Sequence, residues 1–271
     1  MEGQELAFTC STVELTCLAS LLGATAILGV EDPFAGWLAE EVESAWQTAR
    51  QRLAERRALA LQPDGRVALD TRVAALVGTC ARPQASLIVS HVAAGGQPAR
   101  YRYHVGRHRA VEAVEEAGAW RLRALPGAQA VCDRIGQVWG LSRQPAAPGA
   151  ALTLPHDALR QARPAALEGG ADAAGQVLAR PGIDGAAAAA LAAALAGPLT
   201  AGALVALSWR ETVWEVAGMG LLEGVTGLWR LRCFRRLGQA WVEATPCDAA
   251  AAAAEIRRLM NRVLPVPLAA A

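Results

Sequence analysis

AWVEATPCDAAAAAAEIRRLMNRV, residues 240–263, holds a tryptophan-bearing β-type run that reaches a proline and then an alanine-rich helical run. Residues 119–141, AWRLRALPGAQAVCDRIGQVWGL, show the same order of tryptophan strand, proline and helix. Internal repeats decide architecture, so they are the first feature to seek in a new sequence. The two copies predict a chain built from two related halves.

Three further β-type runs precede each of these corners, separated by glycine-containing or polar turns. The runs cover residues 86–92, 100–105, 109–115 and 119–125 in the first half, and 203–210, 213–222, 228–234 and 239–244 in the second. Short strands in sequence followed by a helix favour antiparallel sheets covered by helices. We therefore predict an α+β fold in which each half is a four-strand antiparallel sheet flanked by helices, the halves being in a pseudo-twofold arrangement. Alternation along residues 101–105, YRYHV, predicts one covered face.

A change in composition marks the boundary between the halves. Residues 143–152 read RQPAAPGAAL, which is rich in proline and alanine and typical of a connection. We predict an N-terminal half over residues 1–141, a linker over 142–153 and a C-terminal half over 154–271.

Capping residues locate the helices of the first half. Ser11 and Glu14 have capping-box spacing and predict a helix that ends near Gly23. Asp32 followed by Pro33 predicts the start of a second helix that runs to about residue 57. Asp70 predicts a third helix, which follows a hairpin with its turn at residues 63–65, PDG.

The second half offers a similar set of signals. A short helix is expected over residues 155–163, and the glycine-rich residues 168–182 are expected to form a mobile loop. Asp184 predicts the N-cap of an alanine-rich helix that stops at Gly197-Pro198. A helix is also predicted over residues 249–263.

Composition excludes several classes of protein. The 271 residues carry a formal net charge of +1 and contain no lysine, which excludes lysine nucleophiles and a P-loop. The cysteines stand at positions 10, 17, 80, 132, 233 and 247, with no C-x-x-C pair, and we expect small buried side chains in a reducing compartment. Neither a signal peptide nor a membrane-spanning run is recognisable. We therefore expect a cytoplasmic protein without membrane insertion.

The sequence shows few residue arrangements that could act in catalysis or bind a metal. His104 and His108 have no neighbouring cysteine or carboxylate pair, and we expect exposed turn histidines and no metal site. Ser90 and His91 are adjacent on a strand, so their side chains point to opposite faces. We predict no catalytic residue, no metal, no cofactor and no enzyme activity.

Arginines along the third strand of the second half suggest an alternative. Arg230, Arg232, Arg235 and Arg236 can form either a phosphate-contacting stripe or an exposed sheet face, and we favour the exposed face. The N-terminal helices with their hairpin are similar to a winged helix, so a nucleic-acid-associated module is the alternative function. A homodimer is also left open.

The tryptophans give the candidate binding site. Trp120, Trp229 and Trp241 lie in alternating strands and are expected in the core. Trp209 and Trp214 flank the polar turn at residues 210–212 and continue along an apolar ridge. The candidate partner-binding residues are Trp209, Trp214, Met219, Leu221 and Leu222. Aromatic residues dominate interface hot spots, which favours a binding site. The same side chains can instead cover the sheet beneath a helix, and from the sequence we favour that interpretation.

The sequence pattern resembles that of the EspG family over nearly the whole chain. The resemblance rests on the helix of residues 13–22, on LAERRALALQPDGRVALDTRVAALVGTCARP from Leu53, on residues 120–126, on LTLPHDALRQA from Leu152, and on GLWRLRCFRRLGQAWVEATP with the helix that follows it. The chain departs from the family at ALVALSWRETVW, residues 203–214, where the family has a glycine-rich polar opening.

The resemblance implies a non-catalytic cytosolic chaperone of type VII secretion. It implies two related α+β halves and binding of the apolar tip of a helical client through the C-terminal half, around its sheet and a loop between strands. In the family the clients are PE–PPE heterodimers. The departure at residues 203–214 suggests a distant relative that serves another helical client.

Overall fold

A computed structural model describes residues 6–62, 66–142, 144–179, 183–210 and 213–264. The fold is α+β, as predicted, with helices packed on antiparallel strands. The chain divides into two compact units, each built from several segments. Unit 1 comprises residues 1–88, 101–131 and 207–214, and unit 2 comprises residues 89–100, 132–206 and 215–271.

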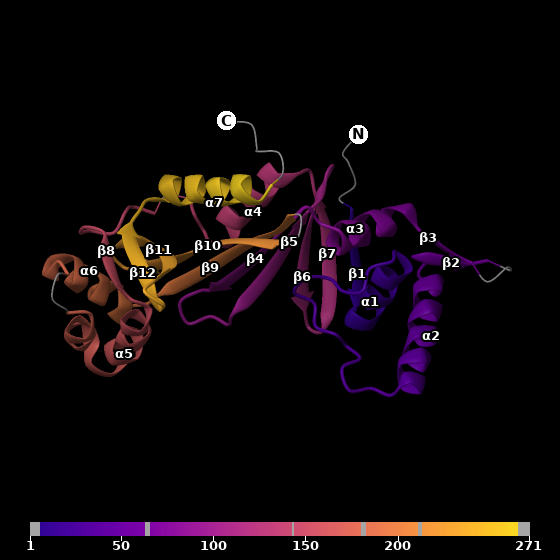
Figure 1. Cartoon of the computed structure of the whole chain (residues 1–271), viewed down its shortest axis with the longest axis horizontal. Helices are drawn as coiled ribbons and strands as arrows, with labels where there is room; N and C mark the ends of the chain where they lie inside the picture. The colour runs from indigo at the N-terminus through magenta and orange to yellow at the C-terminus, as the bar shows by residue number, and fades with distance from the viewer. Residues whose placement is uncertain (1–5, 63–65, 143, 180–182, 211–212, 265–271) are drawn as a thin grey trace. The chain divides into compact units, whose positions relative to one another are not determined.

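Unit 1 combines three helices with a meander of strands. Its elements are β1 (Ala7–Ser11), α1 (Thr12–Leu21), α2 (Ala39–Glu55), β2 (Leu59–Leu61), β3 (Val67–Leu69), α3 (Thr71–Ala81), β6 (Ala110–Glu116) and β7 (Ala119–Leu125), with parts of β4 (Ala85–Val92) and β5 (Ala99–Val105). The strand order is β1-β7-β6-β5-β4. Helices α1 and α3 pack on β7, and α3 also contacts β6 (Figure 1).

The core of unit 1 forms because α1 and α3 bury apolar side chains against the meander strands. Leu15 and Leu18 of α1, and Leu76 of α3, are fully buried in one cluster with Trp120 and Leu122 of β7. The helix starts follow the predicted caps. Ser11 and Glu14 form a reciprocal capping box, and the Asp70 carboxylate accepts hydrogen bonds from two backbone amides of α3.

Helix α2 begins later than its proline signal predicts. Asp32 accepts a hydrogen bond from the Phe34 backbone amide at 2.9 Å, but a turn and not a helix follows. Gly36 has φ +84°, a left-handed conformation that interrupts a right-handed helix. The helix therefore starts at Ala39, where Glu41 accepts a hydrogen bond from the Leu38 backbone amide.

Unit 2 contains the second meander with its own helices. Its elements are α4 (Ala128–Val138, from Cys132 on), β8 (Leu152–Pro155), α5 (His156–Leu178), α6 (Gly185–Ala196), β9 (Thr200–Arg210), β10 (Val213–Gly224), β11 (Gly227–Arg236), β12 (Gln239–Pro246) and α7 (Ala249–Val263), with residues 207–214 of β9 and β10 assigned to unit 1. The strand order is β9-β10-β11-β12-β8. Buried side chains of α5 and α6 join Leu154, Trp229 and Ala244 in one cluster.

The glycine-rich segment after residue 168 is helical and not a loop. Helix α5 continues to Leu178 through a kink at Gly170, whose φ is +72°. Ala162, Ala166 and Ala174 are buried against α6, so the small side chains allow the helices to pack closely. Residues 180–182, the end of the expected loop, lie outside the described part of the chain.

Each meander is extended by a strand that the sequence pattern did not reveal. Strand β1 pairs antiparallel with β7, from Ala7 opposite Arg123 to Ser11 opposite Ala119. Strand β8 pairs antiparallel with β12, from Pro155 opposite Trp241 to Leu152 opposite Ala244. The expectation of four strands in each half is therefore too low, because a fifth strand is added beside the last strand of each meander.

The remaining elements lie close to their predicted positions. All eight meander strands and the helices capped by Ser11, Asp70 and Asp184 are present, and α7 covers residues 249–263 as predicted. The predicted turns at residues 63–65 and 211–212 lie outside the described residues. Within the described residues, no helix is both long enough and apolar enough to cross a membrane.

Candidate functional site

Two of the five candidate binding residues form an exposed aromatic pair in unit 1. Trp209 is the next-to-last residue of β9 and Trp214 is the second residue of β10, and their ring centroids lie 5.2 Å apart at an interplanar angle of 67°. Trp209 is 54% exposed and Trp214 is 53% exposed. Tryptophan is enriched at protein interfaces, and this exposed pair lies beside a cavity, so it is a candidate contact site.

A cavity of about 460 Å³ opens beside the two tryptophans. Residues from four parts of unit 1 line it: the loop after α1 (Ala26–Gly29), the end of α3 and the turn after it (Cys80–Gln84), the start of β4 (Ala85, Ser86), and β9 and β10 (Leu207–Trp209, Trp214). Its size lies within the range of small-ligand and side-chain pockets. The sequence pattern did not reveal this lining, because the contributing segments are far apart along the chain.

The loop wall of the cavity is fixed by an arginine and a glycine. The Arg82 guanidinium donates hydrogen bonds to the Leu22 carbonyl at 2.8 Å and the Gly23 carbonyl at 3.4 Å. A Cβ atom at Gly29 would lie 2.7 Å from the Arg102 side chain, so only glycine fits as the loop passes Arg102. The wall is therefore held in place before any partner binds.

A buried histidine supports the strand that carries the cavity wall. Ser86 Oγ and His104 Nδ1 are 3.0 Å apart, and both residues are buried. Burial lowers the pKa of the His104 imidazole from 6.5 to about 4, and the positive charge of Arg102 contributes. The expectation that His104 is an exposed turn residue is wrong, because residues 102–105 are buried on both faces of β5.

The other three candidate residues occupy a different environment in unit 2. Met219 is 5% exposed, Leu221 is 4% exposed and Leu222 is 9% exposed. Leu222 packs in the same cluster as Trp229, beneath α5 and α6. The structure therefore brings Trp209 and Trp214 together at the surface and places Met219, Leu221 and Leu222 in the interior.

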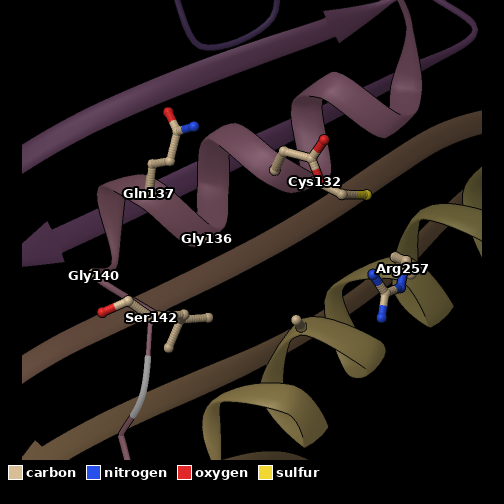
Figure 2. Close-up of a pocket in the computed structure, with 9 residues that line it drawn as sticks. Cys132, Gly136, Gln137, Gly140, Ser142 and Arg257 are labelled. Atoms are coloured by element: carbon tan, nitrogen blue, oxygen red, sulfur yellow. The ribbon is translucent and has the colours of Figure 1, made fainter.

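Unit 2 has a separate groove between α4 and α7 (Figure 2). Its volume is about 420 Å³, and its lining includes Cys132, Gly136 and Gly140 from the α4 side and Arg257 from α7. Burial raises the pKa of the Cys132 thiol to about 12, with Asp133 contributing. The thiol is therefore protonated at neutral pH and is a poor nucleophile.

Three other buried thiols are similarly inert. Burial raises the pKa of the Cys10 thiol to about 12 and of the Cys247 thiol to about 11, and it also raises the pKa of the Cys80 thiol. Cys233 is exposed, contrary to the expectation that all six cysteines are buried. Across the ranges that the structure covers, no three histidine, cysteine or acidic side chains gather as a metal site would require.

The arginine stripe on β11 is partly engaged by α7. Arg230 Nη1 lies 3.8 Å from a Glu255 carboxylate oxygen, and Arg258 Nη2 lies 2.6 Å from the other oxygen. The hydrogen bond from Arg258 lowers the pKa of the Glu255 carboxyl group, and Arg230 and Arg232 contribute. Arg230 is thus part of the packing of α7 on the sheet and not of an exposed face.

Comparisons with known proteins agree with this fold. The structure is similar to that of the Mycobacterium tuberculosis type VII secretion system chaperone EspG5, solved in complex with a PE25–PPE41 dimer: the TM-score is 0.65 at 17% identity, covering 97% of this chain and 98% of that chain. No curated protein matches the sequence. The model of the EspG family matches residues 11–258. Because that match spans most of the sequence, the chain belongs to the EspG family.

Proposed function

We propose that this chain is a type VII secretion chaperone that binds a helical client protein and acts by binding and not by catalysis. The observation that carries the proposal is the exposed Trp209–Trp214 pair at the mouth of an apolar cavity. Family membership supports the chaperone role. EspG5 was solved with a PE25–PPE41 dimer, and the client proposed here is of that helical kind.

The geometry suits the apolar tip of a helical hairpin. Trp209 and Trp214 can each bury about half of their surface against such a tip, and the cavity between α3 and the loop after α1 can receive one or two client side chains. Aromatic anchors beside a preformed pocket supply most of the binding energy in many interfaces. The chaperone would cover the tip while the client waits in the cytosol for export.

Met219, Leu221 and Leu222 have a supporting role in this proposal. They anchor β10 in the interior of unit 2, and Trp214 is the second residue of the same strand. We also propose that the two meanders derive from one ancestral half. The support is that both are extended by a strand beside their last member, β1 in one unit and β8 in the other.

The test is calorimetric titration of the purified chain with helical secretion substrates encoded beside its gene, each produced as its natural pair. Trp209→Ala and Trp214→Ala should each weaken binding by about 30-fold, because truncation of a central tryptophan anchor typically costs 2 kcal/mol or more. Half-exposed side chains contribute little to the stability of the unbound protein, so the melting temperature of each variant should stay close to that of the wild type.

Trp37→Ala is the matched control. Trp37 is 48% exposed and also belongs to an edge-to-face aromatic pair, with Phe34 at 5.8 Å, but it does not line the cavity. This variant should bind the client with unchanged affinity. Equal affinity of the Trp209, Trp214 and Trp37 variants for the client would show that the pair is not the contact site.

Family membership favours this function over a nucleic-acid-associated module. The two also differ in a simple observable. Nucleic-acid binding weakens steeply with salt, whereas insertion of apolar side chains into a cavity depends little on salt.

A further inference from the structure

Unit 1 carries a second exposed aromatic surface, which the client site does not use. Trp37 is 48% exposed and Leu38 is 69% exposed, just before α2. Between residues 31 and 43 the chain holds five carboxylates and no basic residue: Glu31, Asp32, Glu40, Glu41 and Glu43. We call residues 31–43 the acidic patch.

The acidic patch is held in a fixed shape. The Phe34 amide donates to Asp32 Oδ1 and the Leu38 amide donates to Glu41 Oε2, both at 2.9 Å. The Phe34 ring packs against both Trp37, at 5.8 Å, and Trp46, at 6.3 Å. The exposed apolar side chains therefore sit on a preorganised base, which lowers the entropy cost of binding.

Unit 2 carries a surface with the opposite charge. The hairpin between β11 and β12 turns at Leu237 and Gly238, whose φ values are +50° and +80°. Leu237 is 97% exposed, and Arg235 and Arg236 immediately before it are exposed as well. Arg232, farther from the turn, lies opposite Glu243, so the positive charge is concentrated at residues 235–237, which we call the basic tip.

We propose that the basic tip of one copy of this chain docks on the acidic patch of a second copy. Leu237 packs on Trp37 and Leu38, while Arg235 and Arg236 approach the carboxylates on either side. An arginine already packs on an aromatic ring beside the patch within one chain, because the Arg50 guanidinium lies 5.6 Å from the centroid of the Trp46 ring.

The charges of the acidic patch and the basic tip favour a second copy of this chain as the binding partner. Every copy supplies both surfaces, and a chain with a formal net charge of +1 experiences little overall repulsion from its twin. Complementary charges at an interface rim steer association and make it dependent on salt. The acidic patch also disfavours nucleic acid and anionic lipid, which would meet five carboxylates.

The experiment is sedimentation velocity of the full chain over a range of concentrations, at about 50 mM and about 500 mM NaCl. The patch variant is Trp37→Ala with Glu40→Arg, which leaves the capping residue Glu41 in place. The tip variant is Leu237→Asn with Arg236→Glu, because asparagine tolerates the left-handed conformation at residue 237. Trp214→Ala is the matched control.

The wild type and the Trp214→Ala control should associate with rising concentration, about tenfold more weakly at the higher salt. Each variant alone should remain monomeric, whereas an equimolar mixture should form a 1:1 dimer, because the mixture contains one intact patch and one intact tip. A wild type that stays monomeric at low salt would overturn the proposal. Association that persists in either variant alone, or a mixture that fails to form a dimer, would overturn it equally.

Discussion

His104 should make the stability of this protein fall as the pH drops below about 6.5. The imidazole is 1% exposed, and its pKa is lowered from 6.5 to about 4 in the folded chain, first by burial and then by Arg102. In the unfolded chain the imidazole regains its ordinary pKa and binds a proton below 6.5. The unfolded state then holds more protons than the folded state, and acid favours unfolding.

The magnitude follows from the two pKa values. At about pH 7.5 both states are nearly neutral at this residue, so the linkage contributes almost nothing. At about pH 5 the unfolded chain is almost fully protonated and the folded chain is not, which lowers the free energy of unfolding by about 2 kcal/mol. Below the folded pKa of about 4 the loss levels off.

The assay compares urea unfolding of the wild type and of His104→Gln at about pH 7.5 and about pH 5, followed by tryptophan fluorescence. Glutamine has no titrating group but retains a hydrogen-bonding partner for Ser86 Oγ, which lies 3.0 Å from His104 Nδ1. The wild type should lose about 2 kcal/mol more than the variant between the two pH values. Equal losses in both proteins would refute the reasoning, as would an NMR titration of His104 with a midpoint near 6.5.

Two stability predictions test local features of the fold. Asp70→Ala should lower the free energy of unfolding by about 1 kcal/mol in urea denaturation, because the Asp70 carboxylate accepts hydrogen bonds from the Arg72 and Val73 amides, at 2.9 and 3.0 Å. Gly202→Ala should cost about 1–3 kcal/mol, since its Cβ would lie 2.6 Å from Trp139 Nε1. Gly136→Ala is the matched control: no atom lies within 4 Å of its Cβ on α4, so calorimetric melting should show equal or higher stability. A Gly202 variant as stable as the wild type would contradict the close packing of Trp139.

The sequence alone predicted the helix starts and strands that depend on residues close together in the chain. The carboxylates of Asp70 and Asp184 and the pairing of Ser11 with Glu14 start helices whose first amides need acceptors. The eight meander strands were also predictable, because β-branched and aromatic residues alternate between glycine turns. Trp120 and Trp229 are fully buried, as their alternation predicts.

Features that depend on distant partners were not predictable from one sequence. Residues 7–11 and 152–155 form strands because β7 and β12 offer unpaired edges, which no local pattern records. The helix after residue 168 persists because α6 buries its alanines, overriding the weak helix propensity of glycine. Asp32 and Pro33 have the signature of a helix start, but Gly36 three residues later turns the chain away.

In the candidate site, too, features set by neighbouring residues were predictable and features set by distant residues were not. Alternation and the polar turn singled out Trp209 and Trp214, and both are exposed. The continuing ridge to Leu222 was expected to share that surface, but Leu222 packs beneath α5 and α6, and Met219 and Leu221 are buried as well. The cavity wall could not be deduced, because Ile27, Cys80 and Ser86 meet only after the chain has folded.

The returning strands β1 and β8 also have a consequence for how the protein is made. Ala7 pairs with Arg123, and Pro155 pairs with Trp241, so β1 and β8 can pair only when β7 and β12 have left the ribosome. Pairings between residues so far apart in sequence fold slowly, and the nascent edge of β7 remains open until β1 returns to it. Residues 7–11 are thus fixed only after residues 119–123 have been made. Substitutions that weaken the pairing of β1 with β7 should therefore impair folding yield during synthesis more than they lower the stability of protein that has already folded.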